Sequence, residues 1–303
     1  SVIVRNASPD ISFDRSINPY RGCEHGCIYC YARPSHAWLG LSPGLDFETR
    51  LIARPGATAV LRRELSARAY VPATVAIGSN TDPYQPIEAK YRITRHILEV
   101  LREFNHPVTV ITKGTLVERD VDILAEMGRA GLAQVAVSIT TLDAVLARRM
   151  EPRAPTPQRR LAVIRRLSEA GCAVRIMVAP IIPALSVHEL EAILEAGAQA
   201  GATAAGWIML RLPLEVAGLF REWLAQHYPD RAARIMARLN EMHGGRDYDA
   251  TPGHRMRGRG HYATLIRQRF EIAARRHGLV RRPPPLRCDL FRVPGRAQQL
   301  SFL

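Results

Sequence analysis

The sequence Cys23-Glu24-His25-Gly26-Cys27-Ile28-Tyr29-Cys30 places three cysteines in the pattern C-x3-C-x2-C, directly after a predicted strand near residues 11–17. Three thiols this close either react or bind a soft metal. Zinc would require a fourth ligand, which His25 or His36 could supply, although zinc motifs usually consist of two separated pairs. A bacterial ferredoxin run has another spacing and a fourth cysteine. A [4Fe–4S] cluster held by three cysteines leaves one iron open to a small molecule.

The two remaining cysteines, Cys172 and Cys288, lie far from this cluster in the sequence. An odd number of cysteines, three of them clustered, is not the pattern of a disulfide framework. We therefore expect a reducing compartment, and the cytoplasm is the expected location.

Short runs rich in β-branched residues alternate with amphipathic segments up to residue 209. The predicted strands are 11–17, 74–78, 108–112, 134–139, 173–178 and 204–209. The predicted helices are 57–70, 87–104, 116–130, 156–170 and 187–200. This alternation predicts an α/β fold of parallel βαβ units. An open six-stranded barrel and a doubly wound sheet both fit, and either one places the functional site at the carboxyl ends of the strands.

The strand pattern stops after Met209. Segments 214–227, 230–243 and 262–277 predict helices, with a Gly- and Arg-rich loop between the last two and a Pro-rich, extended tail. The loop resembles the flexible basic segments that follow nucleic-acid backbones. We therefore divide the chain into a core with the cysteine loop at 1–210 and a mainly helical, basic C-terminal region at 211–303.

The composition is that of a globular protein with a full-sized core, since the 303 residues are 47% hydrophobic and 23% charged. It argues against wholesale disorder and against a fibrous chain. No apolar run approaches the ~20 residues of a membrane span, because the best candidate, 173–185, contains Arg175, Pro180 and Pro183. The first residues do not form a signal peptide, and the missing initiator Met leads us to expect an upstream segment.

Positive charge is concentrated near the C-terminus. The chain has 42 Lys and Arg against 28 Asp and Glu, a formal net charge of +14. Residues 253–303 contain 12 Arg and 2 acidic residues, so most of the excess lies there. A concentrated basic region favours a polyanionic partner such as nucleic acid, although a solvated basic surface has the same composition.

The cysteine spacing, with the aromatic Tyr29 before the last cysteine, resembles the signature of the radical S-adenosylmethionine (SAM) superfamily. The resemblance implies a [4Fe–4S] cluster on Cys23, Cys27 and Cys30, whose open iron binds SAM. It implies an enzyme that generates a 5′-deoxyadenosyl radical and receives its electron from a donor such as flavodoxin or ferredoxin. It also implies a partial (βα)6 barrel, which agrees with the strand pattern.

Further motifs between about residues 13 and 185 resemble the spore photoproduct lyase-like branch, which includes bacterial DNA-repair-photolyase-like proteins. They are Pro19-Tyr20-Arg21-Gly22-Cys23, Val110-Ile111-Thr112-Lys113, Val137-Ser138-Ile139, Met150-Glu151-Pro152 and Val178-Ala179-Pro180-Ile181. This resemblance implies a lyase-like reaction on nucleic acid, as DNA lesion repair or base modification, with DNA as the favoured partner.

The same resemblance implies a set of SAM-binding residues, most of them at strand ends. Tyr29 would lie near the adenine, Ser79, Asn80, Thr81 and Asp82 near the amino group, Lys113 near the carboxylate, Ser138 near the ribose, and Arg175 and Ala179 near the adenine or methionine. Asp82 is the strongest of these candidates, because a carboxylate pairs with an ammonium group.

One position departs from the lyase. Where the lyase carries a hydrogen-donating cysteine, this chain has Ser79, whose O–H bond is too strong to donate hydrogen readily. Either the chemistry differs or another residue is the donor. The candidates for this catalytic role are Cys288, Tyr20, Tyr31 and Tyr84.

Two other functions remain open from the sequence. One is a radical SAM enzyme that acts on a peptide or small molecule, with the basic region serving solubility. The other is an Fe–S protein that binds nucleic acid without turnover. Arg148, Arg149, Glu151 and Arg153 follow a predicted strand and would either hold substrate phosphates or form exposed ion pairs.

The last residues, Gln299-Leu300-Ser301-Phe302-Leu303, resemble the short peptide by which bacterial replication and repair proteins dock on the sliding clamp. A glutamine followed by apolar side chains suits a polar rim and a hydrophobic cleft. The sequence therefore suggests the clamp as a partner, with a terminus that folds back on the domain as the alternative.

Overall fold

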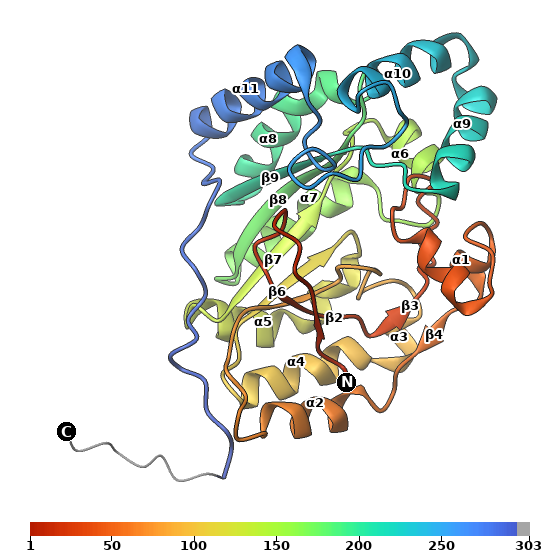
Figure 1. Cartoon of the computed structure of the whole chain (residues 1–303). Coiled ribbons are helices and arrows are strands. Elements are labelled where there is room, and N and C mark those ends of the chain that lie inside the picture. Colours follow the sequence, from red (N-terminus) through yellow and green to blue (C-terminus); the bar gives the residue numbers. More distant parts are fainter. Residues whose placement is uncertain (296–303) are drawn as a thin grey trace.

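A curved sheet forms the centre of the computed structural model, which describes residues 1–295 (Figure 1). In spatial order its strands are β1 (Val4–Arg5), β2 (Arg15–Ile17), β5 (Val75–Ile77), β6 (Val108–Thr112), β7 (Ala133–Ser138), β8 (Ala173–Ile181) and β9 (Ala204–Met209). The strands from β2 to β9 are parallel, and β1 is antiparallel to β2. The carboxyl ends of the six parallel strands therefore meet at one edge.

Strand order decides between the two architectures that the sequence left open. The parallel strands follow one another in chain order, whereas a doubly wound sheet reverses its order at a switch point. Among the strands described in 1–295, β9 pairs with β8, and no further strand closes the gap to β1. The fold is therefore the predicted partial (βα)6 barrel.

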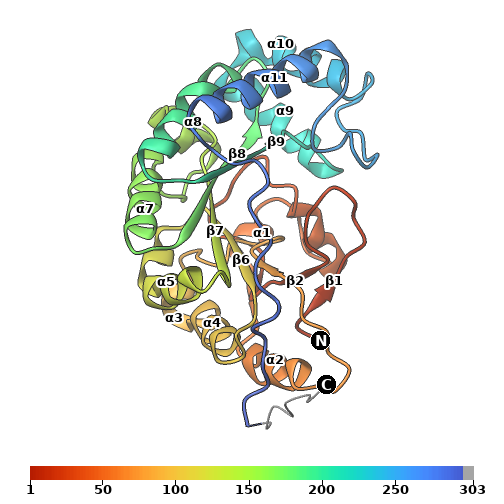
Figure 2. The ribbon, with the colours of Figure 1, turned by 90° about the vertical axis from the view of Figure 1, so that its left-hand side faces the viewer.

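Helices cover the outer face of the curved sheet (Figure 2). They are α2 (Ala57–Leu65), α3 (Glu88–Tyr91), α4 (Ile93–Glu103), α5 (Val121–Arg129), α7 (Pro157–Glu169) and α8 (Leu190–Gln199), with 3-10 turns η2 (Thr115–Asp120) and η3 (Val187–Glu189). The short α6 (Ala144–Met150) comes between β7 and α7 in the chain. The predicted helix at 87–104 is divided at Arg92, whose left-handed φ of 52° ends α3 before α4 begins.

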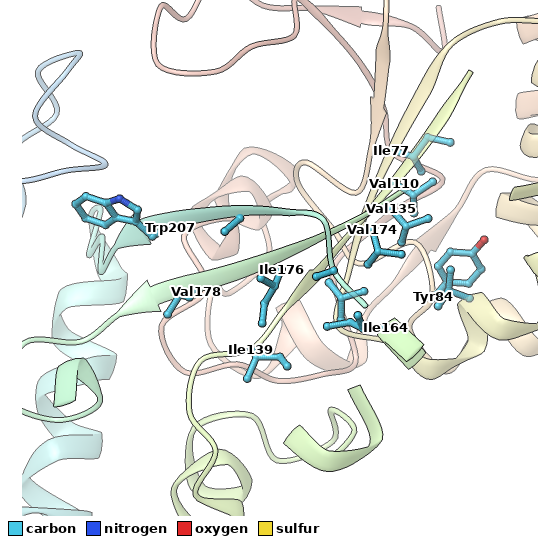
Figure 3. Packing of buried hydrophobic residues seen from close by; sticks show 14 of the residues in the cluster. Ile77, Tyr84, Val110, Val135, Ile139, Ile164, Val174, Ile176, Val178 and Trp207 are labelled. Atoms are coloured by element: carbon cyan, nitrogen blue, oxygen red, sulfur yellow. The ribbon is translucent and has the colours of Figure 1, made fainter. Parts of the chain in front are cut away.

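The core lies between the sheet and these helices (Figure 3). All six residues of β7 are buried, as expected for a strand covered on both faces. Along β8, Val174, Ile176 and Val178 are buried on one face and alternate with half-buried residues on the other. Gly197 lets α8 approach this strand, because a Cβ there would collide with Ile176.

The three helices predicted after residue 209 are present as α9 (Glu215–His227), α10 (Pro229–Met242) and α11 (Gly260–Arg276). The Gly- and Arg-rich loop before α11 differs from the expected flexible segment, because its arginines bind the rest of the protein. Arg255 pairs with Asp10, and Arg257 donates to the Trp207 carbonyl at 2.7 Å and lies over the Trp207 ring.

Residues 280–292 form an extended segment, here called the C-terminal strap, along the amino edge of the sheet (Figure 2). Val280 bridges to the first residue of β9. Further along, the Arg287 amide donates to the carbonyl of Gly131, before β7, and the Arg292 amide donates to the carbonyl of Phe104, before β6, both at 2.9 Å. The strap therefore lies at the edge opposite the carboxyl ends of the strands.

Several short elements had no signal in the sequence. They are β1, β3 (Tyr20–Arg21), β4 (Ile52–Ala53), η1 (Arg33–Leu39), α1 (Asp46–Thr49) and α6. Elements of two to seven residues are too short for a periodic pattern. No helix within residues 1–295 combines the length and the apolar character that a membrane crossing requires.

Candidate functional site

The cysteine loop lies at the carboxyl edge and is attached to two neighbouring segments. The Cys23 amide donates to the carbonyl of Phe47 in α1 at 2.9 Å. The Ile28 amide donates to the carbonyl of Met150, the last residue of α6, at 3.0 Å. The loop is therefore fixed on both sides by backbone hydrogen bonds.

A buried arginine holds the inside of this loop. The Arg33 guanidinium, whose residue is 1% exposed, donates to the carbonyls of Cys27 at 3.0 Å and Gly26 at 3.2 Å, and it pairs with Glu48. Gly26 has a φ of 69°, and a Cβ there would collide with the Arg153 guanidinium. No sequence pattern singles out Arg33, because it is one arginine among many in an Arg-rich chain.

The environment of the three thiols is unfavourable for their charged forms, with Cys23 and Cys27 buried and Cys30 half-buried. Burial raises the pKa of Cys23 well above its usual value, and Asp82 and the other two cysteines raise it further. Burial also raises the pKa of Cys27 to about 12, against the opposing effect of Lys113. Three neighbouring thiolates therefore need a cationic partner in the loop, and the irons of a [4Fe–4S] cluster supply one.

The zinc alternative requires ligands that converge on one centre. Within residues 1–295, no group of three or more His, Cys, Asp or Glu side chains forms a metal-ion site. Each of the two histidines considered for a zinc site has one ring nitrogen in contact with another group: His25 Nδ1 lies 3.4 Å from Asp82, and His36 Nε2 lies 3.1 Å from the Arg50 carbonyl. All ligands of a zinc ion surround one atom, whereas each cysteine of a [4Fe–4S] cluster binds a different iron. Three cysteines that do not converge on one point therefore fit the cluster better than zinc.

Residues 79–81 follow β5 and are tied to the segment before the cysteine loop. The Ser79 hydroxyl accepts from Asn18 Nδ2 at 3.2 Å, and the Asn80 amide donates to Asn18 Oδ1 at 2.9 Å. The Thr81 hydroxyl donates to the Gly22 carbonyl. The structure thus brings this predicted SAM-binding segment against the cysteine loop.

Asp82 is the polar centre of this edge. Its carboxylate accepts from the Thr112 hydroxyl at 2.6 Å, the Lys113 amide at 2.7 Å and the Tyr84 amide at 2.9 Å, in addition to its contact with His25. Burial raises its pKa, but His25 and these hydrogen bonds outweigh burial and hold the pKa at about 2. Because these donors occupy its acceptor positions, Asp82 joins the ends of β5 and β6, and its contact with the SAM ammonium stays a prediction.

Three other predicted residues lie at the same edge. Lys113 follows β6, and its ammonium lies 5.8 Å from the centre of the Tyr29 ring. Ser138 is the buried last residue of β7, and Ala179 lies near the end of β8. Arg175 is different, because it lies near the start of β8, where it donates to the carbonyl of Arg281 in the C-terminal strap. The structure therefore separates Arg175 from the other candidates.

Glu151 corrects an expectation from the sequence, which offered a phosphate contact or an exposed ion pair. It is 1% exposed and accepts hydrogen bonds from Tyr29, Thr140 and Arg160. Arg160 is also 1% exposed and reaches the Ser138 carbonyl at 3.1 Å. Burial raises the pKa of Glu151, but Arg160 and Lys113 outweigh it and hold the pKa at about 2. This buried pair positions Tyr29 beside the cysteines.

Tyr31 is the candidate hydrogen donor that lies in the site. It follows Cys30, is 42% exposed, and its hydroxyl donates to the Ser79 carbonyl. The Arg211 guanidinium, directly after β9, lies 3.9 Å from the centre of its ring. Tyr31 thus extends from the cysteine loop to Ser79, the residue that we aligned with the hydrogen-donating cysteine of the lyase.

The other candidate donors point elsewhere. The Tyr20 hydroxyl donates to Glu88, and the Tyr84 hydroxyl donates to Asp120 at 2.9 Å, both in buried networks. Cys288 lies in the C-terminal strap at the opposite edge, next to the residue that binds Gly131. The structure therefore does not bring Cys288 to the cysteine loop.

Comparisons with known proteins agree with this geometry. The family model described as the radical SAM superfamily matches residues 17–197. The uncharacterized protein Rv2578c of Mycobacterium tuberculosis is 37% identical over 289 residues, which are 95% of this chain and 82% of that protein. The uncharacterized protein MJ0683 of Methanocaldococcus jannaschii is 27% identical over 172 residues, 56% of this chain and 61% of that protein.

Solved structures show the same fold. A mutant of spore photoproduct lyase superimposes with a TM-score of 0.66 at 18% identity, covering 91% of this chain and 78% of that one. The lyase complexed with dinucleoside spore photoproduct gives a TM-score of 0.64 at 18% identity, covering 90% and 77%. The family match spans more than half of the sequence and includes the whole cysteine loop. The chain therefore belongs to the radical SAM superfamily, and it is an enzyme whose cofactors are a [4Fe–4S] cluster and SAM.

Proposed function

We propose that this enzyme acts on nucleic acid, and that its substrate is a DNA lesion or a modified base. The core at 1–210 would carry out the radical chemistry, and the region at 211–303 would supply contacts to the nucleic acid. The observation that carries the proposal is the net charge of +10 on residues 253–303. The likeness of the fold to spore photoproduct lyase supports the same substrate class.

Carboxylates of the protein neutralise only part of this charge. Four of the arginines are paired: Arg255 with Asp10, Arg269 with Glu191, Arg281 with Glu271, and Arg287 with Asp289. Seven more are exposed and have no ion pair within the described residues, namely Arg257, Arg259, Arg267, Arg275, Arg276, Arg282 and Arg292. Unpaired surface cations attract a polyanion and release its counterions on binding.

Different residues at the carboxyl edge would then bind SAM and return the hydrogen atom. When bound, the cluster and SAM supply a 5′-deoxyadenosyl radical that abstracts a hydrogen atom from the substrate. Lys113 and Ser138 would hold SAM by its carboxylate and ribose. Tyr31 would return a hydrogen atom, because its phenol lies beside Ser79, whose hydroxyl is a poor donor.

Isotope transfer tests this function. The reconstituted enzyme is incubated with SAM, a reductant and UV-irradiated oligonucleotides that carry deuterium on their thymine groups. We expect deuterium in the 5′-deoxyadenosine, and a Cys23→Ala variant that forms none. If SAM is cleaved at the same rate with and without nucleic acid, and no deuterium is transferred, the nucleic-acid substrate is wrong. Deuterium from a labelled peptide instead would identify the alternative substrate class.

The role of Tyr31 is tested in the same assay. We expect Tyr31→Phe to retain SAM cleavage and deuterium transfer to 5′-deoxyadenosine, because hydrogen abstraction does not need the phenol. Product formation should fall, because the product radical lacks its donor. Tyr84→Phe serves as the matched control, and equal product formation by the two variants would exclude Tyr31 as the donor.

A further inference from the structure

A second feature of the carboxyl edge is a basic groove beside the helices that follow the barrel. It has a volume of about 530 Å³ and lies between α10, α11 and the loop after β8. Arg231, Arg234 and Arg238 form its α10 wall, with His188 and Tyr262 on the other sides. We call this feature the α10 arginine groove.

The arginines of the groove form a row. Residues 231, 234 and 238 are spaced i, i+3 and i+7, so they lie on one face of α10 and span about 10 Å along its axis. No Asp or Glu is among the residues that line the groove. The groove therefore presents a line of positive charge, which suits a ligand with several negative groups in succession better than a single anion.

The three guanidiniums differ in how they are held. Arg231 donates to the Ala184 carbonyl at 2.6 Å, and Arg238 pairs with Glu241 at 2.7 Å and lies 5.4 Å from the centre of the Tyr262 ring. Arg234 is exposed and makes no hydrogen bond or ion pair within residues 1–295. Two arginines are thus anchored with N–H groups to spare, and the middle one is free to bind a ligand.

The groove lies at the same edge as the cysteine loop. Ala184 and Val187 belong to the loop that leaves the carboxyl end of β8, and the bond from Arg231 joins α10 to that loop. On the neighbouring helix, Trp223 Nε1 donates to the Arg149 carbonyl at 3.0 Å, which attaches α9 to the end of α6. A ligand in the groove therefore lies on the side of the protein that carries the cofactor-binding residues.

We propose that the α10 arginine groove binds the phosphate backbone of the substrate nucleic acid and so guides the strand to the mouth of the barrel. A nucleic-acid strand advances about 3.4 Å per nucleotide in a duplex, so the row of arginines can contact several successive phosphates. These contacts would position the strand without reading its sequence. The proposal rests on the proposed function, because it assigns the place where that substrate class is held.

The test compares two triple variants that remove the same charge. One is Arg231→Gln, Arg234→Gln and Arg238→Gln in the groove. The control is Arg63→Gln, Arg68→Gln and Arg165→Gln, three exposed arginines on or next to α2 and α7. Binding of a fluorescent 20-nucleotide thymidine strand to the reconstituted enzyme is measured between 50 and 200 mM salt. SAM cleavage without nucleic acid reports whether each variant is folded and loaded.

We expect the groove variant to lose about 2 from the slope of log K against log salt, since each single-strand contact contributes about 0.7. The same contacts make its affinity on the order of 100-fold weaker at 0.1 M salt. The control variant should keep a nearly unchanged slope, and both variants should cleave SAM at the normal rate.

The outcomes separate this proposal from the proposed function. If the groove variant binds like the wild type, or if both triple variants weaken binding equally, the groove assignment is wrong while the nucleic-acid substrate stands. If the wild type binds no strand but still transfers deuterium from an oligonucleotide, the groove assignment again fails alone. Absence of both binding and transfer in the wild type overturns the two proposals together.

Discussion

The two edges of one parallel sheet differ in chemistry. The carboxyl edge holds buried charges, with Asp82 bound by donors from three segments and Glu151 paired with Arg160. The amino edge is covered by the C-terminal strap, whose Phe291 packs against the rings of Phe104 and other aromatic residues. The loops after the strands therefore carry the site, while the loops before them contribute to stability.

The difference has an energetic side. Removing an ion pair from water costs free energy, so buried pairs contribute little net stability. At the carboxyl edge they serve instead to hold neighbouring side chains such as Tyr29 in place. At the amino edge, the contacts of Phe291 with Tyr70, Phe104 and His106 bury apolar area instead. Substitutions at the first edge should therefore affect cofactor binding, and substitutions at the second should affect the free energy of unfolding.

The largest effect is expected from the cysteine loop. Changing Cys23, Cys27 or Cys30 to Ala should abolish both the cluster and SAM cleavage, because the open-iron geometry needs all three thiolates. Iron content, the visible absorption of the cluster and 5′-deoxyadenosine formation measure the loss.

Cysteines outside the loop provide the matched controls. Cys288→Ala, in the strap, and Cys172→Ala, before β8, should keep the iron content and SAM cleavage of the wild type. A loop variant with a full cluster and normal SAM cleavage would refute the ligand assignment. Loss of turnover with an intact cluster in Cys288→Ala would refute the contrast between the edges.

A smaller effect is expected from the buried pair behind Tyr29. Glu151→Ala should lower the free energy of unfolding by about 3–5 kcal/mol, because it leaves the Arg160 charge buried without a partner. Urea unfolding measures this loss.

The double variant Glu151→Leu, Arg160→Met separates charge from position. It should recover most of the stability, because the unpaired charge is gone. It should still bind SAM more weakly than the wild type, because Tyr29 has lost its acceptor. If the single variant is as stable as the wild type, the buried charge of Arg160 does not need Glu151 as its partner. If the double variant binds SAM normally, the pair does not position Tyr29.

The sequence predicted the strands of the barrel well, because each buried strand is a short β-branched run between amphipathic helices. Residues 108–112 and 204–209 were predicted with the bounds that β6 and β9 have. The choice between barrel and doubly wound sheet could not be made, since strand order is a property of long-range pairing. The extended conformation of the tail was predicted from its prolines, but its packing along the amino edge was not. That packing consists of single backbone hydrogen bonds and one aromatic ring, which leave no period in the sequence.

The residues of the site that belong to a sequence motif were predicted correctly. The residues whose role depends on their being buried were missed. The cysteines stand out by spacing, and Lys113 stands out as one of two lysines in the chain. Glu151 and Arg33 look like surface residues in the sequence, and only the fold shows that both are buried. Cys288 and Arg175 have suitable chemistry, but the fold places them at or near the other edge, which the order of residues along the chain did not reveal.

A more modest effect is expected from pH at the amino edge. Burial lowers the pKa of His106 from 6.5 to about 4, because the ring is fully enclosed between Tyr70, Phe291 and the Pro107 carbonyl. As pH falls below 6.5, the unfolded chain takes up a proton that the folded protein refuses until about pH 4. The free energy of unfolding should therefore fall by about 1 kcal/mol between pH 7.5 and 5.5 on account of His106.

His106→Gln isolates this contribution. Urea unfolding at the two pH values should show a smaller pH-dependent loss in the variant than in the wild type, although the variant is less stable at pH 7.5. An equal loss in both proteins would show that His106 is not the group responsible. SAM cleavage by the variant at pH 7.5 should be unchanged, because the residue lies at the edge away from the cysteine loop.

The smallest effect on the enzyme itself is expected at the C-terminal peptide. Gln299–Leu303 lies outside the described residues. Gln299→Ala with Leu300→Ala should abolish clamp binding, because it removes the polar and apolar anchors together, while stability and SAM cleavage stay unchanged. Surface plasmon resonance with a purified bacterial clamp measures the binding. Equal or absent binding for the wild type and the variant would remove the clamp as a partner, and slower SAM cleavage by the variant would mean that the peptide contributes to the site after all.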